Sequence, residues 1–321
     1  MTKPTHTPRA LVAGAAGLIG SALCRYLLDH GIEVIAVDNF STGSAKNIEA
    51  LYNHPHFSHY CHDICSPLEN ITQPLNFIYH LASPASPDDF DALALEILDV
   101  NSKGTENLLK LAQAKGAKLL FSSTSEVYGD PLVHPQTESY WGNVNPSGPR
   151  SCYDESKRFG EALITHYARL HSVDYVIARI FNTYGPRMRI NDGRVVPAFI
   201  KAAVQGEPML LHGGGQQTRS FCHVDDLVRG LAHLMHSEKT TGETFNIGNP
   251  QEFTMEVLAT TLWEIVDKPV KLKAVPSPRE DDPVRRRPDI SKIKDLLGWE
   301  PEIYLRDGLL QTVKNFEERL K

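Results

Sequence analysis

The sequence predicts an α/β protein in which a parallel sheet is wound by helices on both faces and is joined to a smaller C-terminal domain. Three observations lead to this class. Short β-branched runs alternate with helical patterns through the first half of the 321 residues. A glycine-rich turn follows the first of these runs. Beyond residue 182, glycine and proline become frequent and the elements shorten, which indicates a second, smaller unit.

Each strand is expected where an apolar, β-branched run lies between turn residues. Such runs occupy residues 10–13, 33–37, 76–80, 118–122 and 175–179. Long amphipathic patterns at 92–115 and 152–170 predict two helices between strands. Runs at 223–236 and 245–248 are expected to return the chain to the sheet after it has left for the smaller domain.

The composition excludes several classes of protein. With 41% hydrophobic and 22% charged residues, the chain is typical of a globular protein. A net charge of -6 argues against a general nucleic-acid binder, so a phosphate-bearing ligand needs a local arginine cluster. The most apolar early run, 11–23, is too short for a membrane span and is broken by glycines. We therefore expect neither a nucleic acid nor a membrane as partner.

The cysteines predict a reducing compartment. They are five in number and scattered, which fits free thiols and a cytoplasmic location. The first eight residues have no signal-peptide core. A group of histidines and cysteines at 56–65 matches no zinc spacing and lies across an expected strand, whose side chains alternate between faces. We expect no metal.

A dinucleotide site is predicted where the first strand ends. The segment Gly14-Ala-Ala-Gly17-Leu-Ile-Gly20 allows a tight turn, close approach of backbone to a pyrophosphate, and close packing of helix on strand. A lone glycine motif is weak, but Asp38 follows at the end of the second strand, at the distance the dinucleotide fingerprint requires. A carboxylate there accepts hydrogen bonds from ribose hydroxyls and repels a 2′-phosphate, which favours NAD over NADP. Asp63 and Ile64, after a later strand, are candidates for holding adenine.

A proton-transfer pair is predicted on the helix at 152–170. Tyr153 and Lys157 are four residues apart, so they lie on one face of the helix. A tyrosine with a pKa of about 10 is a poor base at neutral pH. A neighbouring ammonium, helped by a positively charged nicotinamide ring, favours the phenolate. Such a pair suits removal of a proton from a secondary alcohol while hydride leaves the same carbon.

With these segments in place, the chain resembles the extended short-chain dehydrogenase/reductase family from about residue 9 to its end. The resemblance implies a Rossmann domain with retained NAD at residues 1–181, to which 220–249 return, and a nucleotide-sugar domain at 182–219 and 250–321. It implies the following cofactor positions: Gly14, Gly17, Leu18, Ile19, Gly20, Asp38, Asn39, Gly43, Asp63, Ile64, Leu81, Ala82, Ser83, Asn101, Tyr153 and Lys157.

Long phrases carry a closer likeness within that family, to the UDP-glucuronate decarboxylases. They lie at 80–87, 122–131, 140–146, 148–154, 178–188 and 191–196. One departure lies beside the expected sugar pocket: after Pro87 the decarboxylases continue with a Tyr- and Asn-Pro-bearing segment, whereas residues 88–92 here read Asp-Asp-Phe-Asp-Ala.

The resemblance implies a reaction in three stages. Tyr153 removes the proton of the sugar C4 hydroxyl while hydride passes to NAD, with Lys157 lowering the tyrosine pKa and Thr124 bonding the same oxygen. The C4 ketone lies β to the C6 carboxylate, so CO2 can leave. Hydride then returns to C4, and UDP-glucuronate becomes UDP-xylose.

The resemblance also assigns the remaining site residues. The catalytic set is Thr124, Glu126, Tyr153, Lys157 and Arg286, with Arg286 directed at the sugar carboxylate. The substrate set is Ser125, Asn182, Arg187, Arg219, Arg279 and Arg286. Arg150 is expected to order the loop before its helix.

The segment after Thr124 separates the decarboxylases from their relatives. A 4,6-dehydratase has Asp at the position of Ser125, and serine is too weak an acid to protonate a departing C6 hydroxyl. A simple 4-epimerase has a small or neutral residue at the position of Glu126. Glu126 could promote CO2 loss by charge repulsion, manage the proton at C5, or be a solvated carboxylate.

Three functions remain open on the sequence. The first is the decarboxylase; the second is a UDP-glucuronate or UDP-hexose 4-epimerase, favoured by the altered segment after Pro87. The third, a non-catalytic NAD-binding protein, is disfavoured by the intact Thr124, Tyr153 and Lys157. The helices at 92–115 and 152–170 carry apolar stripes beyond what one sheet face needs, and in the family such helices form a four-helix bundle, so we expect a homodimer.

Overall fold

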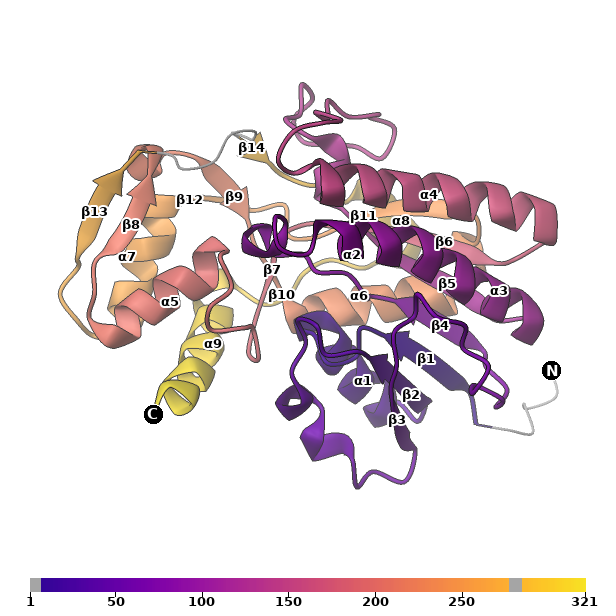
Figure 1. The fold of residues 1–321 in the computed structure, drawn as a ribbon. Helices are drawn as coiled ribbons and strands as arrows, with labels where there is room; N and C mark the ends of the chain where they lie inside the picture. Colours follow the sequence, from indigo (N-terminus) through magenta and orange to yellow (C-terminus); the bar gives the residue numbers. More distant parts are fainter. Residues whose placement is uncertain (1–6, 277–284) are drawn as a thin grey trace.

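The structure, a computed structural model, describes residues 7–276 and 285–321 (Figure 1). Within these ranges a seven-stranded parallel sheet has the order β11-β6-β5-β4-β1-β2-β3. Its strands are β1 (Arg9–Ala13), β2 (Glu33–Asp38), β3 (Phe57–Cys61), β4 (Phe77–His80), β5 (Lys118–Thr124), β6 (Tyr175–Ile180) and β11 (Glu243–Ile247). The order reverses between β1 and β4, which creates a crevice at their carboxyl ends. The predicted fold class is confirmed.

Helices cover both faces of this sheet (Figure 1). On one face α1 (Leu18–Asp29) packs against α6 (Val224–His236), and on the other α3 (Thr105–Lys115) packs against α4 (Ser151–His171). Successive side chains of β1 therefore enter two different apolar cores, Val12 on the side of α1 and Leu11 on the side of α3. Burial of both faces explains why the strands read as continuous apolar runs.

The helix expected at 92–115 is divided in the structure. It consists of α2 (Ala94–Asp99), a π-helical turn at Val100–Gly104, and α3. Asn101 is fully buried in this turn and its amide donates to the Ile97 carbonyl over 3.0 Å. Gly104 approaches the Ile64 side chain so closely that a Cβ would lie 2.9 Å from it. The widened turn is thus a response to close packing that no helical periodicity reveals.

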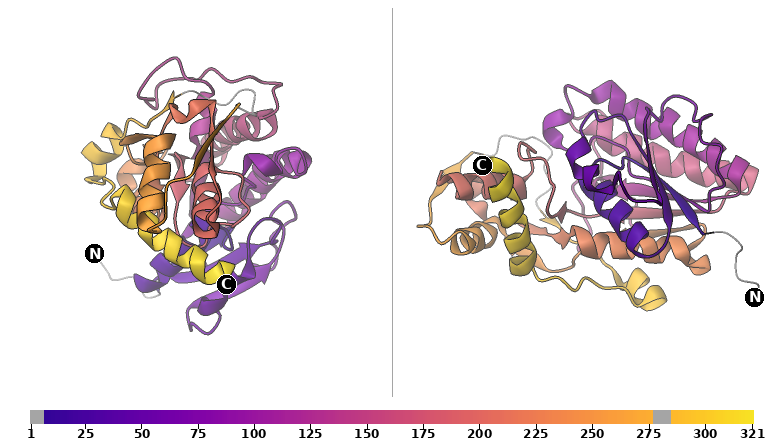
Figure 2. Two further views of the ribbon diagram at one scale, coloured as in Figure 1. Left: turned by 90° about the vertical axis from the view of Figure 1, so that its left-hand side faces the viewer. Right: turned by 90° about the horizontal axis from the view of Figure 1, so that it is seen from below.

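The smaller part of the molecule packs three helices around a third core (Figure 2). These are α5 (Val195–Gln205), α7 (Met255–Ile265) and α9 (Leu305–Leu320), which enclose Trp263 and Phe316. Short strands complete it: β8 (Met209–His212) with β13 (Leu272–Val275), and β9 (Thr218–Ser220) between β12 (Glu252–Thr254) and β14 (Arg285–Arg286).

The chain crosses between the two parts several times. The paired strands β7 (Thr183–Tyr184) and β10 (Cys222–His223) carry it out of and back to the main sheet. α8 (Ser291–Leu297) packs on β11, and Trp299 lies in the core of the main sheet. The expectation that all of 250–321 joins the smaller domain is therefore corrected, because the apolar side chains around 290–299 complete the sheet's core instead.

Candidate active site

The glycine turn after β1 has the shape of a backbone cradle. Gly14 has φ 82°, and a Cβ there would lie 2.7 Å from the backbone of Leu81. A Cβ on Gly20 would collide with the Gly14 backbone. α1 begins at Leu18, so the first amides of the helix face a turn that no side chain fills. A pyrophosphate fits such an arrangement, because unpaired amides and the helix dipole both favour an anion.

Asp38, at the end of β2, is placed to receive a ribose. Its Oδ2 accepts a 2.8 Å hydrogen bond from the Ala16 amide, and its Oδ1 accepts one of 2.7 Å from the Phe40 amide. These bonds fix the carboxylate, and each oxygen keeps a lone pair for a hydroxyl group. Burial raises the pKa of Asp38, although the two amides oppose this.

A cavity of about 200 Å³ joins the turn to Asp38 and continues toward Ala82 and Val100. Most expected cofactor positions line it, namely Gly14, Gly17, Asp38, Asn39, Gly43, Asp63, Ile64, Leu81, Ala82 and Ser83. Asn101 lies behind this wall and donates to the Ser83 hydroxyl over 3.0 Å. Leu18 packs in the apolar cores. The residues present therefore fit the adenosine and diphosphate of NAD.

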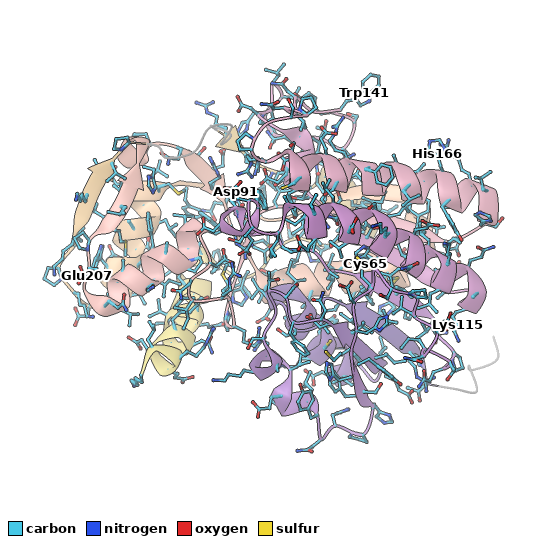
Figure 3. The ribbon with its side chains drawn as sticks, viewed as in Figure 1. Cys65, Asp91, Lys115, Trp141, His166 and Glu207 are labelled. Carbon is cyan, nitrogen blue, oxygen red and sulfur yellow. The ribbon has the colours of Figure 1, made fainter. Side chains whose placement is uncertain are left out.

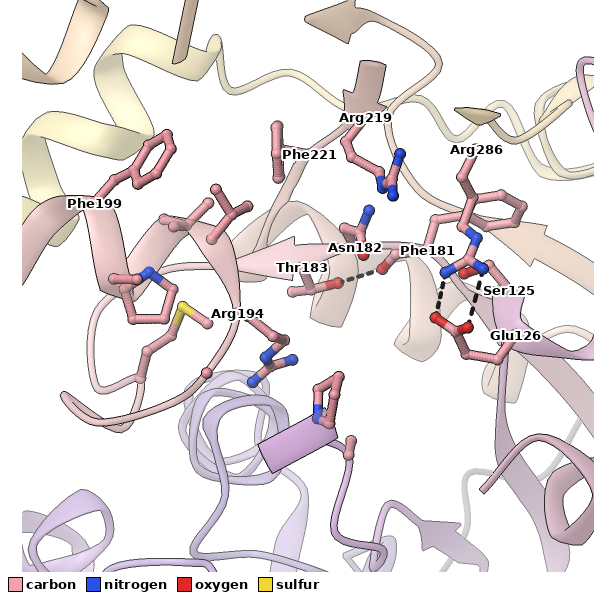
Figure 4. A pocket seen from close by; sticks show the side chains of 18 of the residues that line it. Ser125, Glu126, Phe181, Asn182, Thr183, Arg194, Phe199, Arg219, Phe221 and Arg286 are labelled. Carbon is pink, nitrogen blue, oxygen red and sulfur yellow. Dashed lines mark hydrogen bonds and ion pairs between the residues drawn. The ribbon is translucent and has the colours of Figure 1, made fainter. Parts of the chain in front are cut away.

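A larger cavity of about 580 Å³ lies between the carboxyl edge of the sheet and the smaller part (Figure 4). The structure brings together in its wall Ile19, Thr124, Ser125, Glu126, Tyr153, Lys157, Asn182, Arg219 and Arg286. Strand β5 ends at Thr124, and the 3-10 turn Ser125–Tyr128 that follows it brings Ser125 and Glu126 to the same wall. Helix α4 delivers Tyr153 and Lys157 from one face.

The tyrosine and lysine are both buried. The Lys157 Nζ lies 5.8 Å from the centre of the Tyr153 ring and donates to the Ser122 carbonyl over 2.8 Å. Burial lowers the pKa of Lys157 to about 7. Burial also raises the pKa of Tyr153, while a hydrogen bond with Thr124 and the charge of Arg194 oppose the rise. Burial is thus the largest influence on the pKa of Tyr153, and it opposes the lowering expected from Lys157 and the nicotinamide ring.

Glu126 is held between two arginines in the wall of the cavity, and Figure 4 shows its pair with Arg286. Arg286 pairs with both of its oxygens, and the Arg150 Nη2 donates to Oε2 over 2.6 Å. Burial alone would raise the pKa of Glu126, but the charges and hydrogen bonds of Arg286 and Arg150 outweigh it and lower the pKa to about 2. The glutamate is thus not a solvated carboxylate, and it carries no proton to donate at neutral pH. Of the roles left open above, an action through charge fits this geometry better than management of the proton at C5.

Asp154 adds a second carboxylate beside this group. It is buried on the first turn of α4, with Oδ2 3.9 Å from the Arg150 Nε. Burial raises the pKa of Asp154 to about 7, and the charge of Glu126 adds to the rise. Because the folded state binds the proton more tightly than the unfolded chain, stability is lost as the pH rises from about 4 to about 7, and the loss is complete above that.

Asp154→Asn should therefore stabilise the protein more at pH 8 than at pH 5. The difference in unfolding free energy between variant and wild type should grow across this range, by at most about 1.4 kcal/mol per pH unit. Urea unfolding at the two pH values measures it, and the comparison cancels other titrating groups. A difference that does not change with pH would contradict a raised pKa.

One of the expected substrate arginines, Arg187, is not in the cavity wall. Arg187 adopts φ 71° and donates its amide to the Asn315 side chain over 2.9 Å, and it lines neither cavity. Its left-handed backbone directs the turn after β7 toward α9. Arg279 lies outside the described residues. Arg219 does line the larger cavity, from β9.

Three residues of the larger cavity were not assigned a site role from the sequence. Arg150 was expected to order a loop but binds Glu126. Arg194 lines the cavity and is held by the Asp192 carboxylate over 2.6 and 2.8 Å. Phe90 lies against Tyr153. Arg194 lies in the decarboxylase-like phrase at 191–196, so the sequence could have identified it. Phe90 lies in the segment 88–92 that departs from the family pattern, so no sequence feature pointed to it.

In residues 7–276 and 285–321 no three His, Cys, Asp or Glu side chains are placed to share a metal ion. In the same ranges no helix has the length and apolar character needed to cross a bilayer.

The chain matches a known family model and is similar to proteins of known activity and structure. Residues 10–248 match the model of the NAD-dependent epimerase/dehydratase family. The chain is 51% identical to UDP-glucuronic acid decarboxylase 6 of Arabidopsis thaliana, over 97% of this chain and 90% of that protein. It is 47% identical to UDP-glucuronic acid decarboxylase 1 of Xenopus tropicalis, over 98% and 73%. A solved UDP-glucuronic acid 4-epimerase of Bacillus cereus, with UDP-glucuronic acid and NAD, superposes with a TM-score of 0.88 at 29% identity, over 98% and 100%.

Proposed function

This chain belongs to the NAD-dependent epimerase/dehydratase family, and on that premise we propose that it decarboxylates UDP-glucuronate to UDP-xylose with NAD as cofactor. The observation that carries the proposal is the buried Glu126–Arg286 pair in the same cavity as Tyr153. The pair places the Arg286 guanidinium in the same cavity as the proposed base, where a substrate carboxylate needs positive charge. Curated relatives of 47–51% identity that carry this activity support the same choice.

The cofactor would be held by the glycine turn, the start of α1 and Asp38. When bound, NAD takes up hydride from the sugar C4 and later returns it, and the positive charge of its oxidised ring favours the Tyr153 phenolate. The proposed NAD-binding part comprises residues 1–181 and 220–249. The remaining segments, apart from the stretch around 290–299, bind the nucleotide sugar through Asn182 and Arg219, and Ser125 of the NAD-binding part contributes from the other side of the cavity.

Tyr153 accepts the proton of the C4 hydroxyl, and Thr124 hydrogen-bonds the same oxygen. Loss of CO2 from the β-keto acid then sends an electron pair toward the ketone oxygen. Thr124 and the protonated Tyr153 donate to that oxygen, a contribution of about 3–4 kcal/mol where comparable donors have been removed. The Ser122 carbonyl fixes the Lys157 amino group, and the protonated form of this lysine places a positive charge near the phenol.

Incubation with UDP-glucuronate tests this function directly. We expect the nucleotide sugar to lose the mass of CO2, followed by mass spectrometry, with no added reductant because the hydride is returned. A new isomer of unchanged mass would instead indicate the alternative, a UDP-glucuronate 4-epimerase, which the altered segment 88–92 and the similar solved epimerase favour. An unchanged substrate would leave only a non-catalytic NAD-binding protein.

The same proposal includes a homodimer formed through α2 and α4. These helices contact each other and leave Leu95 and Phe159 exposed by 74% and 52%. Buried against a second copy, such apolar side chains would stabilise a four-helix bundle.

We expect Phe159→Glu to shift the protein from dimer to monomer, because a carboxylate would be buried in that bundle. Sedimentation velocity measures the change. Val270→Glu serves as the matched control, since Val270 is 53% exposed in the smaller part, away from α2 and α4. A wild-type protein that sediments as a monomer would contradict the dimer.

All five cysteines are free thiols, which supports a cytoplasmic location; cell fractionation is the check.

A further inference from the structure

Residues 88–90 lie at the rim of the larger cavity, between the two parts of the molecule. Residues 88 and 89 are part of the 3-10 turn Pro87–Asp89, and Phe90 follows this turn in the segment that leads to α2. Pro87 and Phe90 line the cavity. The sequence departs from the decarboxylase pattern in this stretch, and no step proposed above uses it. We call residues 88–90 the strap.

The inner contact of the strap is with the proposed base. The Phe90 ring stacks on the Tyr153 ring, with centroids 5.2 Å apart and planes inclined by 19°. Phe90 is only 4% exposed and packs with Ile97 and Cys152. The guanidinium carbon of Arg150 lies 5.7 Å from the Phe90 ring centre. A flat aromatic contact of this kind restrains the tilt of the tyrosine ring and excludes water from one of its faces.

The outer contact of the strap is with the loop that leads from β7 to α5. The Arg189 Nη2 donates to both oxygens of Asp89, over 2.9 and 2.7 Å, and the two side chains are 34% and 17% exposed. One residue earlier, Asp88 lies so close to Gly193 that a Cβ there would collide with its carboxylate. The same loop continues into Arg194, which lines the cavity.

These contacts couple the loop to the tyrosine. Only one residue, Asp89, separates Asp88, which meets Gly193, from Phe90, which meets Tyr153, so the strap has little slack. If the loop moved away from the sheet, either the Asp89–Arg189 pair would break or Phe90 would be pulled from Tyr153. Arg194 would leave as well, and its charge acts on Tyr153 in the closed arrangement.

We propose that the strap is a positioning element that keeps the cavity closed on the 4-keto sugar until C4 is reduced again. This inference rests on the proposed decarboxylation. That reaction passes through a neutral ketone: the C4–H bond gives its electron pair to NAD, the hydroxyl proton goes to Tyr153, and the C5–C6 pair stays on the sugar as CO2 leaves and C5 gains a proton. If the ketone escapes at this point, UDP-4-keto-pentose is the product and the two electrons remain on the nicotinamide.

The test compares how product divides between UDP-xylose and UDP-4-keto-pentose. Purified wild type, Asp89→Asn, Arg189→Gln and the double variant are each incubated with UDP-glucuronate, and both products and reduced nicotinamide are quantified. Glu300→Gln, which breaks an exposed pair with Lys294 outside both cavities, is the control. Arg189→Lys retains a cation and should restore most of the wild-type division.

We expect each single variant to raise the ketone fraction roughly two- to fivefold, the size that loss of a partly exposed ion pair allows. The double variant should raise it no further, because both changes break one contact. KM for UDP-glucuronate and total CO2 release should stay near wild type, which a general loss of structure would not allow.

If the ketone fraction does not change in the strap variants, or rises equally in Glu300→Gln, the inference about the strap is overturned. The proposed function still stands in that case, provided that wild type releases CO2. Wild type that releases no CO2 would overturn the proposed function and the strap with it.

Discussion

Tyr153→Phe is expected to lower kcat for UDP-glucuronate by about 10²–10⁴-fold, the range that a positioned proton-transfer group supplies. The change removes one oxygen from a side chain that is 7% exposed. The hydrogen bond with Thr124 is lost, but the ring contact with Phe90 and the Lys157 bond to Ser122 do not involve that oxygen. The variant should therefore fold, retain NAD and fail at the first oxidation.

Rapid-mixing absorbance of the nicotinamide and mass spectrometry of the sugar test this result. Tyr140→Phe is the matched control, because its hydroxyl accepts from the Leu132 amide in a loop outside both cavities. Near-normal activity in Tyr153→Phe would remove this residue as the base. Equal losses in both variants would point to a general effect of removing a tyrosine hydroxyl.

Glu126→Gln is expected to slow decarboxylation more than the preceding oxidation, so that reduced nicotinamide and a 4-keto uronate accumulate. The amide keeps the shape of the side chain but not its charge, and it leaves Arg286 and Arg150 without their common anion. Removing one partner of a buried ion pair typically costs about 3–5 kcal/mol. The arginines should move, and Arg286 would no longer be held where the substrate carboxylate is expected.

Single-turnover kinetics separate the two steps. Glu33→Gln is the control, because Glu33 also pairs with an arginine, Arg9, but at the amino ends of β1 and β2, outside both cavities. A control variant of normal activity and a slow second step in Glu126→Gln would assign the effect to the site. Oxidation and decarboxylation slowed alike would argue against a dedicated role for Glu126 in CO2 loss.

The sequence predicted correctly those strands and turns that depend on residues close together in the chain. All five expected strands occur within one or two residues of their ranges, because continuous apolar runs mark strands buried on both faces. The helix at 92–115 was predicted as one piece, whereas Asn101 and Gly104 widen it to a π-helical turn. The reason lies in contacts with Ile64 and Ser156, which are distant in the chain.

The amino-acid order alone determined the glycine turn, the position of Asp38, and a tyrosine and lysine on one helical face, since each depends on residues close together in the chain. Only the tertiary structure decided that Glu126 meets Arg286, 160 residues away, and that Asp89 meets Arg189, 100 residues away. It also decided the charge states, because burial raises the pKa of Tyr153 while two arginines lower that of Glu126. Long-range pairing and desolvation arise when distant segments pack together, and no periodicity in a sequence encodes them.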